Sequence, residues 1–341
     1  MNYFKNFFKT FKNLLFIIKE NRKYIFYSEG KFYQKYFINF VDRFDKNNLK
    51  IYYISSEQDD KINKKNVENL FIGDGIIRKI FFFLVKCEYF FITLTDLDNN
   101  YLKKNNLVKK YVYIFHAAVS THRAYTEKAF DNYDIIFCTS IYHKKELMEK
   151  EILFKLKKKE LIETGYFYLD FLRKNLNKRK DKVETILIAP SWNYSNNNFL
   201  NNYSYNLLKF LLMNKDYKII FRPHPEHFKR SKTIISQIIK SFKTNVLFNL
   251  DDNKENINSM LESDILITDN SGISIEYILG LKKPTIFFDK YPKIHNKSFS
   301  LLTADFIEDD IKKKFGYSNQ NPKFDLIEDY INFARSNIYL K

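Results

Sequence analysis

The chain has little of what marks the commonest small functional motifs: two cysteines, seven glycines, six prolines and one tryptophan among 341 residues. Cys87 and Cys138 lie inside apolar runs, as small buried residues do, and no Cys-x-x-Cys pair or Cys/His cluster suggests zinc. The sequence therefore predicts no metal site and fits a reducing compartment. The glycines of Glu29-Gly30 and Gly73-Asp74-Gly75 form turns rather than a glycine-rich nucleotide fingerprint.

Acidic residues are also in deficit, because 40 Asp and Glu face 57 Lys and Arg, which gives a formal net charge of +17. Such a field favours polyanionic partners: nucleic acid, acidic lipid surfaces or phosphate-bearing substrates. The lysines are spread along the chain rather than gathered in one stripe, which argues against nucleic acid. With 45% hydrophobic residues, the chain can build two domains of ordinary size.

No apolar run is long enough to cross a bilayer, and lysines interrupt the nearest candidate, residues 1–24. This segment carries six basic residues against one acid, Glu20, and no small-residue cleavage site follows it. Apolar residues recur in it at spacings of three and four, which predicts a basic amphipathic helix. Two interpretations stay open: a helix that lies on an anionic membrane face, or a first helix packed on its own domain. The apolar positions are Phe4, Phe7, Phe8, Phe11, Leu14, Leu15 and Ile18.

Short runs rich in Ile, Phe, Tyr and Val alternate with helical stretches in two series, separated by a polar linker at 173–184. Such alternation predicts an α/β protein with two Rossmann-like, doubly wound parallel sheets facing across a cleft. The predicted domains are 25–172 and 185–323, preceded by the helix at 1–24 and followed by a C-terminal helix at 324–341. The predicted strands are Tyr24–Ser28, Lys50–Ser55, Tyr89–Leu94, Tyr111–Phe115, Asp134–Cys138, Leu161–Thr164, Thr185–Ala189, Tyr217–Phe221, Asn245–Asn249, Asp264–Thr268 and Thr285–Asp289.

One tight polar turn in the second domain has the pattern of an anion site. Asp269-Asn270-Ser271-Gly272 joins an apolar strand to a helix, so free backbone N–H groups and the helix dipole point at a ligand there. Ser271 adds a hydroxyl, Gly272 allows close approach, and Glu276 lies one turn on, where a carboxylate can accept hydrogen bonds from ribose. The alternative is a helix N-cap without a ligand.

A second turn, Arg222-Pro223-His224-Pro225, follows the predicted strand Tyr217–Phe221 and is stiffened by its prolines. Arg222 offers a planar fork of donors for phosphate oxygens, and His224 can donate to a phosphate. Ser191, after the first strand of this domain, is a candidate nucleotide contact. The alternatives are a surface turn with an incidental histidine and an ordinary loop.

In the first domain, His116 follows the predicted strand Tyr111–Phe115, where an imidazole suits a general base acting on an acceptor hydroxyl. His122, Arg123 and Asp96 are candidate acceptor-binding residues. His143 and His295 stand in charged surroundings, so the sequence predicts them to be exposed and assigns them no role.

Together these segments resemble the CDP-glycerol:glycerophosphate glycerophosphotransferase family of teichoic-acid-type polymer synthesis. The resemblance rests on His116, on residues 222–225 and on residues 263–272 with Glu276, in the same order and with similar spacing. The chain departs from the family's usual pattern at Phe115-His116-Ala117-Ala118, where Trp-His-Gly-Thr is common. It departs also at Ser271-Gly272, where a Ser pair is common, and at Glu276, where Asp is common.

The resemblance implies a GT-B fold and a peripheral enzyme at the cytoplasmic membrane face, with no cofactor. It implies transfer of a polyol phosphate from a CDP-linked donor to the hydroxyl of a lipid-linked or polymer acceptor, with release of CMP. His116 would then be the general base and His224 would assist at the donor phosphates. Arg222, Asn270 and Ser271 would hold the pyrophosphate, and Glu276 the ribose.

Two other functions remain open from the sequence. A glycosyltransferase of the same fold, using a nucleotide-sugar donor for capsule or lipopolysaccharide, would use the same phosphate site. A basic, non-enzymatic protein that binds membrane or nucleic acid would not need His116 and His224.

Overall fold

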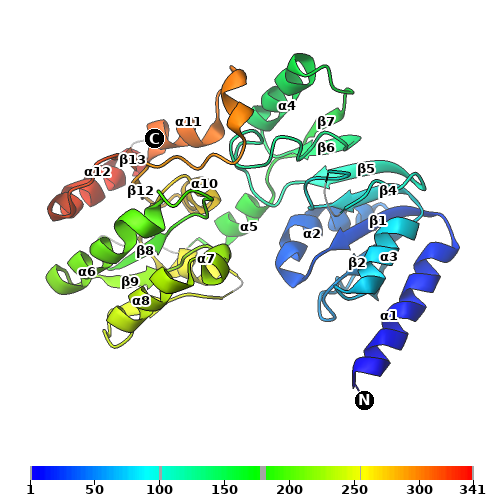
Figure 1. Ribbon diagram of the computed structural model, residues 1–341, viewed down its shortest axis with the longest axis horizontal. Coiled ribbons are helices and arrows are strands. Elements are labelled where there is room, and N and C mark those ends of the chain that lie inside the picture. Colours follow the sequence, from blue (N-terminus) through cyan, green and yellow to red (C-terminus); the bar gives the residue numbers. More distant parts are fainter. Residues whose placement is uncertain (1, 100–101, 177–181, 254, 340–341) are drawn as a thin grey trace. The chain divides into compact units, whose positions relative to one another are not determined.

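The computed structural model describes residues 2–99, 102–176, 182–253 and 255–339, with side chains from Phe7 to Ile338. Residues 177–181 of the predicted linker lie outside the described residues, as do residues 1, 340 and 341 of the predicted terminal helices and the side chains of Phe4 and Lys5. The chain forms two compact units, one of residues 1–117 with 126–167 and one of 118–125 with 168–341 (Figure 1). The short segment Ala118–Tyr125 thus belongs to the second unit, although the residues before and after it in the sequence belong to the first.

The first unit is built on a parallel sheet with the strand order β3-β2-β1-β4-β5-β6-β7. Continuous apolar runs make its central strands, and every residue of β2 is buried, as expected for a sheet covered on both faces. The sequence missed β3, where Glu68 and Asn69 dilute the apolar signal in a half-buried edge strand. The strands are β1 (Arg22–Ser28), β2 (Ile51–Ser55), β3 (Val67–Phe71), β4 (Cys87–Ile92), β5 (Val108–Ile114), β6 (Ile135–Cys138) and β7 (Glu160–Glu163).

Helices α1 (Asn2–Lys19), α2 (Lys31–Lys46), α3 (Ile76–Leu84) and α4 (Ile141–Leu153) belong to this unit. The predicted N-terminal helix ends at Lys19, because residues from Arg22 onward join the sheet as β1. α1 packs on α3 (Figure 1) and also on β3. Its buried side chains are Thr10, Leu14 and Ile17, spaced by four and three residues, so one stripe of the helix faces its own unit.

The second unit repeats the plan with the order β10-β9-β8-β11-β12-β13, again with every pair parallel. In each sheet the second and third strands run out to one side of the first strand and the later strands continue on its other side, which is the doubly wound order. The predicted α/β class with two parallel sheets is confirmed; β13, only two residues long, was not predicted. The strands are β8 (Thr185–Ala189), β9 (Lys218–Phe221), β10 (Phe248–Leu250), β11 (Ile265–Thr268), β12 (Thr285–Phe287) and β13 (Tyr317–Ser318).

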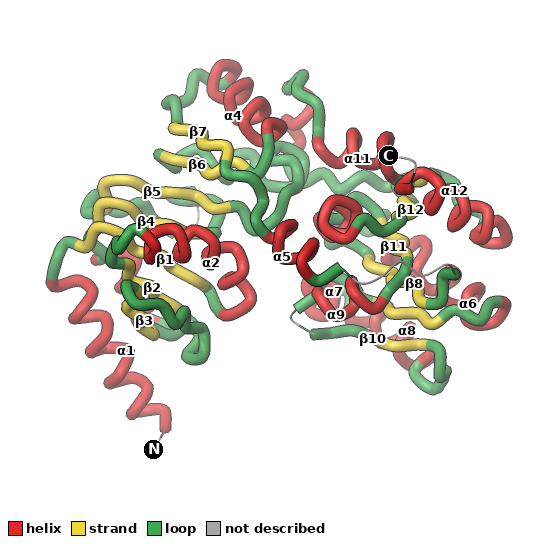
Figure 2. Tube along the Cα trace, turned by 180° about the vertical axis from the view of Figure 1, so that it is seen from behind, coloured by secondary structure: helices red, strands yellow, loops and turns green. Residues whose placement is uncertain are grey.

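Helices of the second unit surround this sheet (Figure 2). α5 packs on the π-helical turn Glu276–Gly280 and belongs to the second unit, whereas the predicted domain boundary at 172 falls inside this helix. α12 packs back on β12 and β13 through core residues such as Ile331 and Ala334. The helices are α5 (Tyr168–Lys174), α6 (Tyr205–Asn214), α7 (Pro225–Arg230), α8 (Lys232–Phe242), α9 (Ile257–Glu262), α10 (Gly272–Ile275), α11 (Ile307–Phe315) and α12 (Ile327–Tyr339), with further π or 3₁₀ turns at Leu200–Ser204, Lys297–Leu301 and Phe324–Leu326.

Candidate active site

The polar turns predicted from the sequence meet at the carboxyl edge of the second sheet. β8 and β11 are neighbours at the point where the strand order reverses, which is where doubly wound sheets bind ligands. The loops after these strands are joined there, because the Asp269 carboxylate accepts hydrogen bonds from the Ser191 N–H (2.9 Å) and hydroxyl (2.7 Å). The His224 N–H donates to the Pro190 carbonyl at 3.1 Å and brings the third loop to the same edge.

Ser191 and Asp269 form a buried support under this edge. Burial raises the pKa of the Asp269 carboxyl, and the hydrogen bonds from Ser191 counteract that rise. The Ser191 carbonyl in turn lies 2.9 Å from Nε2 of His227, whose Nδ1 lies 3.1 Å from the Ser231 hydroxyl. Ser191, predicted as a nucleotide contact, therefore uses its N–H, hydroxyl and carbonyl inside the protein.

His224 has the geometry of a hydrogen-bond donor to an anion. It is the N-cap of α7, and its Nδ1 accepts the Glu226 N–H at 3.2 Å, so the neutral ring carries its proton on Nε2. That Nε2–H makes no hydrogen bond with any residue that the structure describes. The surrounding protein, and after it the positive charge of Lys293, lower the pKa of His224, so the ring is neutral at neutral pH.

Asn270 and Ser271 also keep polar groups unused. The Asn270 side chain is 7% exposed, and within the described chain its buried Oδ1 has no hydrogen-bond partner. Ser271 is the N-cap residue of α10, yet its hydroxyl makes no cap and bonds no described residue. The capping interpretation of this turn therefore explains the backbone but leaves both side chains without a task.

Arg222 and Glu276 lie in a neighbouring polar cluster with internal partners. The Arg222 guanidinium donates to the Asp251 carboxylate at 2.6 Å and to the Asn253 carbonyl at 2.8 Å. Glu276 accepts a hydrogen bond from the Asn256 amide at 3.1 Å, at the point where α10 passes into its π-helical turn. Arg222 is thus paired inside the protein, whereas its predicted role was to bind phosphate.

Two residues that the sequence did not single out lie beside this edge, in the loop after β12. Lys293 is half-buried, and burial lowers the pKa of its ammonium against the opposing charges of Asp269 and Glu308. His295 was predicted to be exposed but is half-buried, with its ring centroid 4.9 Å from that of Tyr194. Burial and then the Lys293 charge lower the pKa of His295 to about 4. The only sequence signal was their position after a strand.

In the first unit, His116 lies just beyond β5 and is half-buried. Its ring packs against the edges of Tyr33 (6.0 Å between centroids) and Tyr36 (6.2 Å), and its carbonyl accepts the Tyr166 hydroxyl at 3.3 Å. Burial, and then the charge of Glu29, raise the pKa of the Tyr33 phenol. The aromatic neighbours hold the imidazole at the carboxyl edge of the first sheet. His143, also predicted to be exposed, is instead fully buried beneath Phe115.

His122 and Arg123, predicted as acceptor contacts, belong to the segment Ala118–Tyr125 that joins the second unit. The Arg123 guanidinium donates to both Asp309 carboxylate oxygens (2.9 and 2.7 Å) and lies over the Phe306 ring. Burial opposes ionisation of Asp309, but the hydrogen bond and charge of Arg123 hold the pKa of that carboxyl below its ordinary value. His122 is buried, and its Nδ1 lies 2.7 Å from the Thr121 hydroxyl. Both residues anchor this segment.

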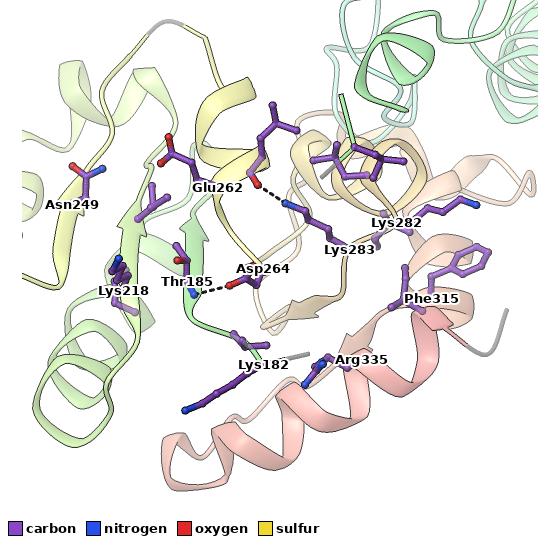
Figure 3. A pocket seen from close by; sticks show the side chains of 18 of the residues that line it. Lys182, Thr185, Lys218, Asn249, Glu262, Asp264, Lys282, Lys283, Phe315 and Arg335 are labelled. Carbon is purple, nitrogen blue, oxygen red and sulfur yellow. Dashed lines mark hydrogen bonds between the residues drawn. The ribbon is translucent and has the colours of Figure 1, made fainter. Parts of the chain in front are cut away.

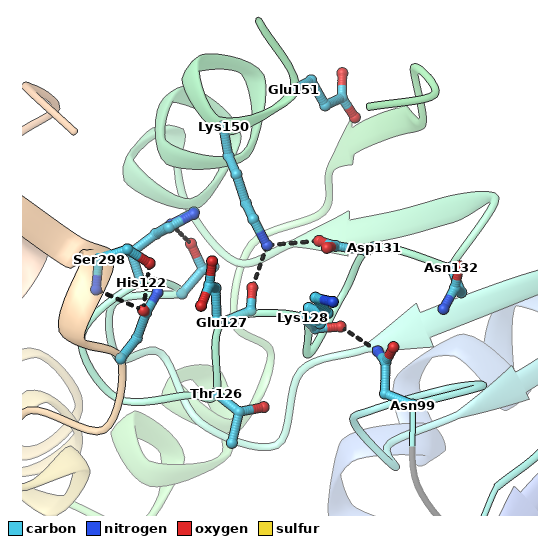
Figure 4. Close-up of polar contacts among 12 residues, drawn as sticks. Asn99, His122, Thr126, Glu127, Lys128, Asp131, Asn132, Lys150, Glu151 and Ser298 are labelled. Atoms are coloured by element: carbon cyan, nitrogen blue, oxygen red, sulfur yellow. Dashed lines mark hydrogen bonds and ion pairs between the residues drawn. The ribbon is translucent and has the colours of Figure 1, made fainter. Parts of the chain in front are cut away.

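Asp96, the third predicted acceptor contact, closes the loop by which the chain returns to the first unit. Its carboxylate accepts hydrogen bonds from Thr95 and Thr126, and its backbone has a left-handed φ of 62°. Nearby, the buried Lys150 ammonium pairs with Asp131 at 2.5 Å and donates to the Glu127 carbonyl (Figure 4). The hydrogen bonds from Thr95 and Thr126 give Asp96 a structural role in this loop.

A cavity of about 970 Å³ lies at the opposite, amino edge of the second sheet, where β8 and β9 begin. Figure 3 shows Asp264, which accepts the Thr185 N–H at 2.9 Å, and Lys283, whose ammonium donates to backbone carbonyls. Asp264 and Lys283 thus have internal partners, and the cavity lies away from the residues predicted for chemistry. Among the described residues, no three His, Cys, Asp or Glu side chains group as metal ligands would.

Comparison with known proteins supports the predicted fold. No curated protein matches the chain. A variant of the wall teichoic acid polymerase TagF is 16% identical, with a TM-score of 0.56 over 100% of this chain and 92% of that one. The UDP-GlcNAc 2-epimerase of Methanocaldococcus jannaschii, in complex with UDP-GlcNAc and UDP, is 13% identical, with a TM-score of 0.53 over 92% and 93%. That of Neisseria meningitidis, bound to UDP-GlcNAc, is 11% identical, with a TM-score of 0.57 over 93% and 91%.

At these identities the likeness shows the fold alone, which is GT-B-like in this chain. Family membership comes from a second finding, a sequence model that matches residues 13–297 and is described as CDP-glycerol:poly(glycerophosphate) glycerophosphotransferase. That match covers β1 to β12 and includes His116, the turn at 222–225 and the turn at 269–272. The chain therefore belongs to the CDP-glycerol:poly(glycerophosphate) glycerophosphotransferase family and is a transferase of that type.

Proposed function

We propose that this transferase moves glycerol phosphate, or a related polyol phosphate, from a CDP-linked donor to the hydroxyl of a lipid-linked or polymer acceptor in the synthesis of a teichoic-acid-type polymer. The observation that carries the proposal is a group of polar side chains at the carboxyl edge of the second sheet that have atoms without partners among the described residues. They are His224 with its Nε2–H, Ser271 with its hydroxyl, and Asn270 with its amide, whose buried Oδ1 is an acceptor. They lie at the switch point of the second sheet, in a chain that belongs to a family of CDP-glycerol-dependent transferases.

The donor's pyrophosphate would be bound by His224, Asn270, Ser271 and the backbone at Gly272. Neutral donors aimed at a phosphate cost no reorganisation when charge moves to the leaving oxygen, so they stabilise the transition state. Glu276 would bind the ribose, because a carboxylate can accept hydrogen bonds from ribose hydroxyls. Its carboxylate is held in place by the Asn256 amide, whose oxygen in turn accepts the Tyr168 hydroxyl.

The acceptor hydroxyl would react at the donor's β-phosphorus. A bond forms between the acceptor oxygen and this phosphorus, the bond from phosphorus to the bridging oxygen breaks, and CMP leaves with the electron pair. His116 accepts the proton of the attacking hydroxyl. Phosphoryl transfer requires little covalent help, so positioning and electrostatics are sufficient.

The proposal is tested by incubating the full chain with CDP-glycerol, CDP-ribitol and UDP-sugars and measuring the nucleotide released. Stabilisation by a CDP-polyol in a thermal-shift panel, with CMP formed on turnover, supports it. UDP formed from a UDP-sugar, with no CMP from either CDP-polyol, would instead establish the nucleotide-sugar transferase. Turnover that survives loss of both His116 and His224 would count against the proposed site.

Arg222 is expected to matter first for stability. The Arg222 and Asp251 side chains are 10% and 4% exposed, so Arg222→Ala leaves a buried carboxylate without its cation. We expect a loss of about 3–5 kcal/mol in the free energy of unfolding, measured by urea denaturation. Arg230→Ala, at an exposed arginine, is the control and should change little. Unchanged stability with weaker pyrophosphate binding would instead support a direct phosphate role.

We further propose that the enzyme is peripheral at the inner face of the cell membrane, bound through α1 and α3. No helix of the described chain is long and apolar enough to span a bilayer. The adjacent helices α1 and α3 nevertheless leave apolar side chains exposed, with Lys9, Lys12 and Lys79 also exposed on them. This membrane patch consists of Phe7, Phe8, Phe11, Leu15, Ile76, Ile80, Phe83 and Leu84. Such a surface suits the headgroup region of an anionic leaflet.

Point substitutions test the membrane patch better than deletion of α1, because Leu14 and Ile17 belong to the core. Phe8→Ser with Phe83→Ser should lower binding to phosphatidylglycerol vesicles about a hundredfold, since each phenyl group contributes roughly 1.5 kcal/mol of burial. The measurement is vesicle sedimentation. Met213→Ser with Val246→Ser, at exposed apolar residues of the second unit, is the control. Equal binding by both pairs would contradict this surface.

A further inference from the structure

Lys293 differs from the other enclosed lysines of the chain. Its ammonium makes no hydrogen bond and no ion pair with any residue that the structure describes. By contrast, the Lys283 ammonium donates to the carbonyls of Met260, Leu261 and Ser263 at 2.6–2.8 Å. The Lys312 ammonium lies 2.8 Å from Asp289. The ammonium groups of Lys283 and Lys312 are therefore held by partners within the protein, whereas that of Lys293 has none among the described residues.

The backbone on both sides of Lys293 is fixed by hydrogen bonds to other loops. The Asn193 amide donates to the Pro292 carbonyl at 3.1 Å, and the His295 N–H donates to the Arg123 carbonyl at 2.8 Å. These contacts tie the loop after β12 to the loop after β8, whose Ser191 holds Asp269. Lys293 is close enough to His224 and to His295 for its charge to lower the pKa of both rings.

Neither of the acids whose charges act on Lys293, Asp269 and Glu308, forms an ion pair with its ammonium. Both Asp269 carboxylate oxygens accept hydrogen bonds from Ser191, and Oε1 of Glu308 accepts the Ser120 N–H at 2.9 Å. A half-buried ammonium with three unused donors is costly unless a ligand completes it. The neighbouring Nε2–H of His224 is an unused hydrogen-bond donor, which is the kind of group that an anion favours.

We propose that Lys293 binds the diphosphate of the nucleotide donor, and so supplies the cation that the sequence had assigned to Arg222. This inference rests on the proposed function and names a further residue of the same site. A lysine ammonium suits the role because its three donors rotate to follow a phosphate whose charge shifts to the leaving oxygen. Because no acid is paired with Lys293, its charge is available to the pyrophosphate, and it would stabilise the departing CMP.

The test is isothermal titration of the full chain and of Lys293→Met with inorganic pyrophosphate, CDP-glycerol and uncharged cytidine. We expect the substitution to weaken pyrophosphate and CDP-glycerol binding roughly 10- to 100-fold, and to leave cytidine binding unchanged. Lys293→Arg should retain part of the affinity. Lys297→Met, at an exposed lysine nearby, is the control and should bind like the unaltered chain.

Urea denaturation of Lys293→Met separates binding from structure. Since the ammonium has no internal hydrogen bond, the unfolding midpoint should stay the same or rise. Unchanged pyrophosphate affinity, or absence of pyrophosphate binding by the unaltered chain, would overturn the inference. An unaltered chain that binds pyrophosphate and UDP-sugars but not CDP-glycerol would overturn the proposed function alone. Loss of pyrophosphate affinity in Lys293→Met would still support the role of Lys293 in that case.

Discussion

His116→Ala is expected to lower the rate of transfer by a factor of roughly 10²–10⁴, with donor affinity almost unchanged. The proposed role of His116 is to accept the proton of the attacking hydroxyl, and without it the proton must pass to water. The imidazole follows β5 and belongs to the first unit, whereas all proposed contacts to the donor belong to the second. Loss of this ring should therefore reduce kcat and leave the Kd for CDP-glycerol intact, measured by CMP release and by titration.

Tyr166→Phe is the matched control for His116. It keeps the aromatic ring and removes only the hydroxyl that donates to the His116 carbonyl, so the imidazole remains and the rate should fall far less. Full activity in His116→Ala would remove this residue from the mechanism. An equal loss of donor affinity would place it with the donor instead of the acceptor.

His224→Ala is expected to lower kcat by a factor of roughly 10²–10³, the usual cost of removing one preorganised donor to developing charge. Because Nδ1 accepts the Glu226 N–H and the pKa of the ring is lowered, His224 should donate through Nε2 in the neutral form between about pH 5 and 8. His224→Gln keeps a side-chain donor and should recover part of the rate. A nitrogen-resolved NMR titration checks the tautomer directly.

His227 provides the contrast, because it lies one helical turn away but has a structural task. Both of its ring nitrogens lie within hydrogen-bond distance of partners, and its side chain is fully buried. His227→Ala should therefore lower stability more than His224→Ala, which removes one N-cap hydrogen bond at an exposed residue. If His224→Ala destabilises the fold as much as His227→Ala does, its loss of activity would not report on the donor. A His224 ring that is protonated at pH 6 would contradict the proposed neutral donor.

Local patterns in the sequence were enough to predict the sheets. Strands such as β8 and β11 are continuous apolar runs that end in polar turns, so their existence, direction and the edge at which the turns meet follow from residues close in sequence. β3 and β13 escaped prediction because an edge strand needs little apolar character and a two-residue strand shows no period. In the same way, the sequence indicated a basic amphipathic helix at the N-terminus, but not which stripe of it is buried.

The sequence by itself determined the α/β fold, the family and the positions of His116, His224, Asn270 and Ser271 at strand ends. Only the tertiary structure decided which charged groups have internal partners, because those partners are distant in the chain. Arg222 pairs with Asp251, 29 residues away, and Arg123 with Asp309, 186 residues away. Lys293 looks like any other lysine in the sequence. That its ammonium has no partner among the described residues appears only when the loops after β8, β11 and β12 come together.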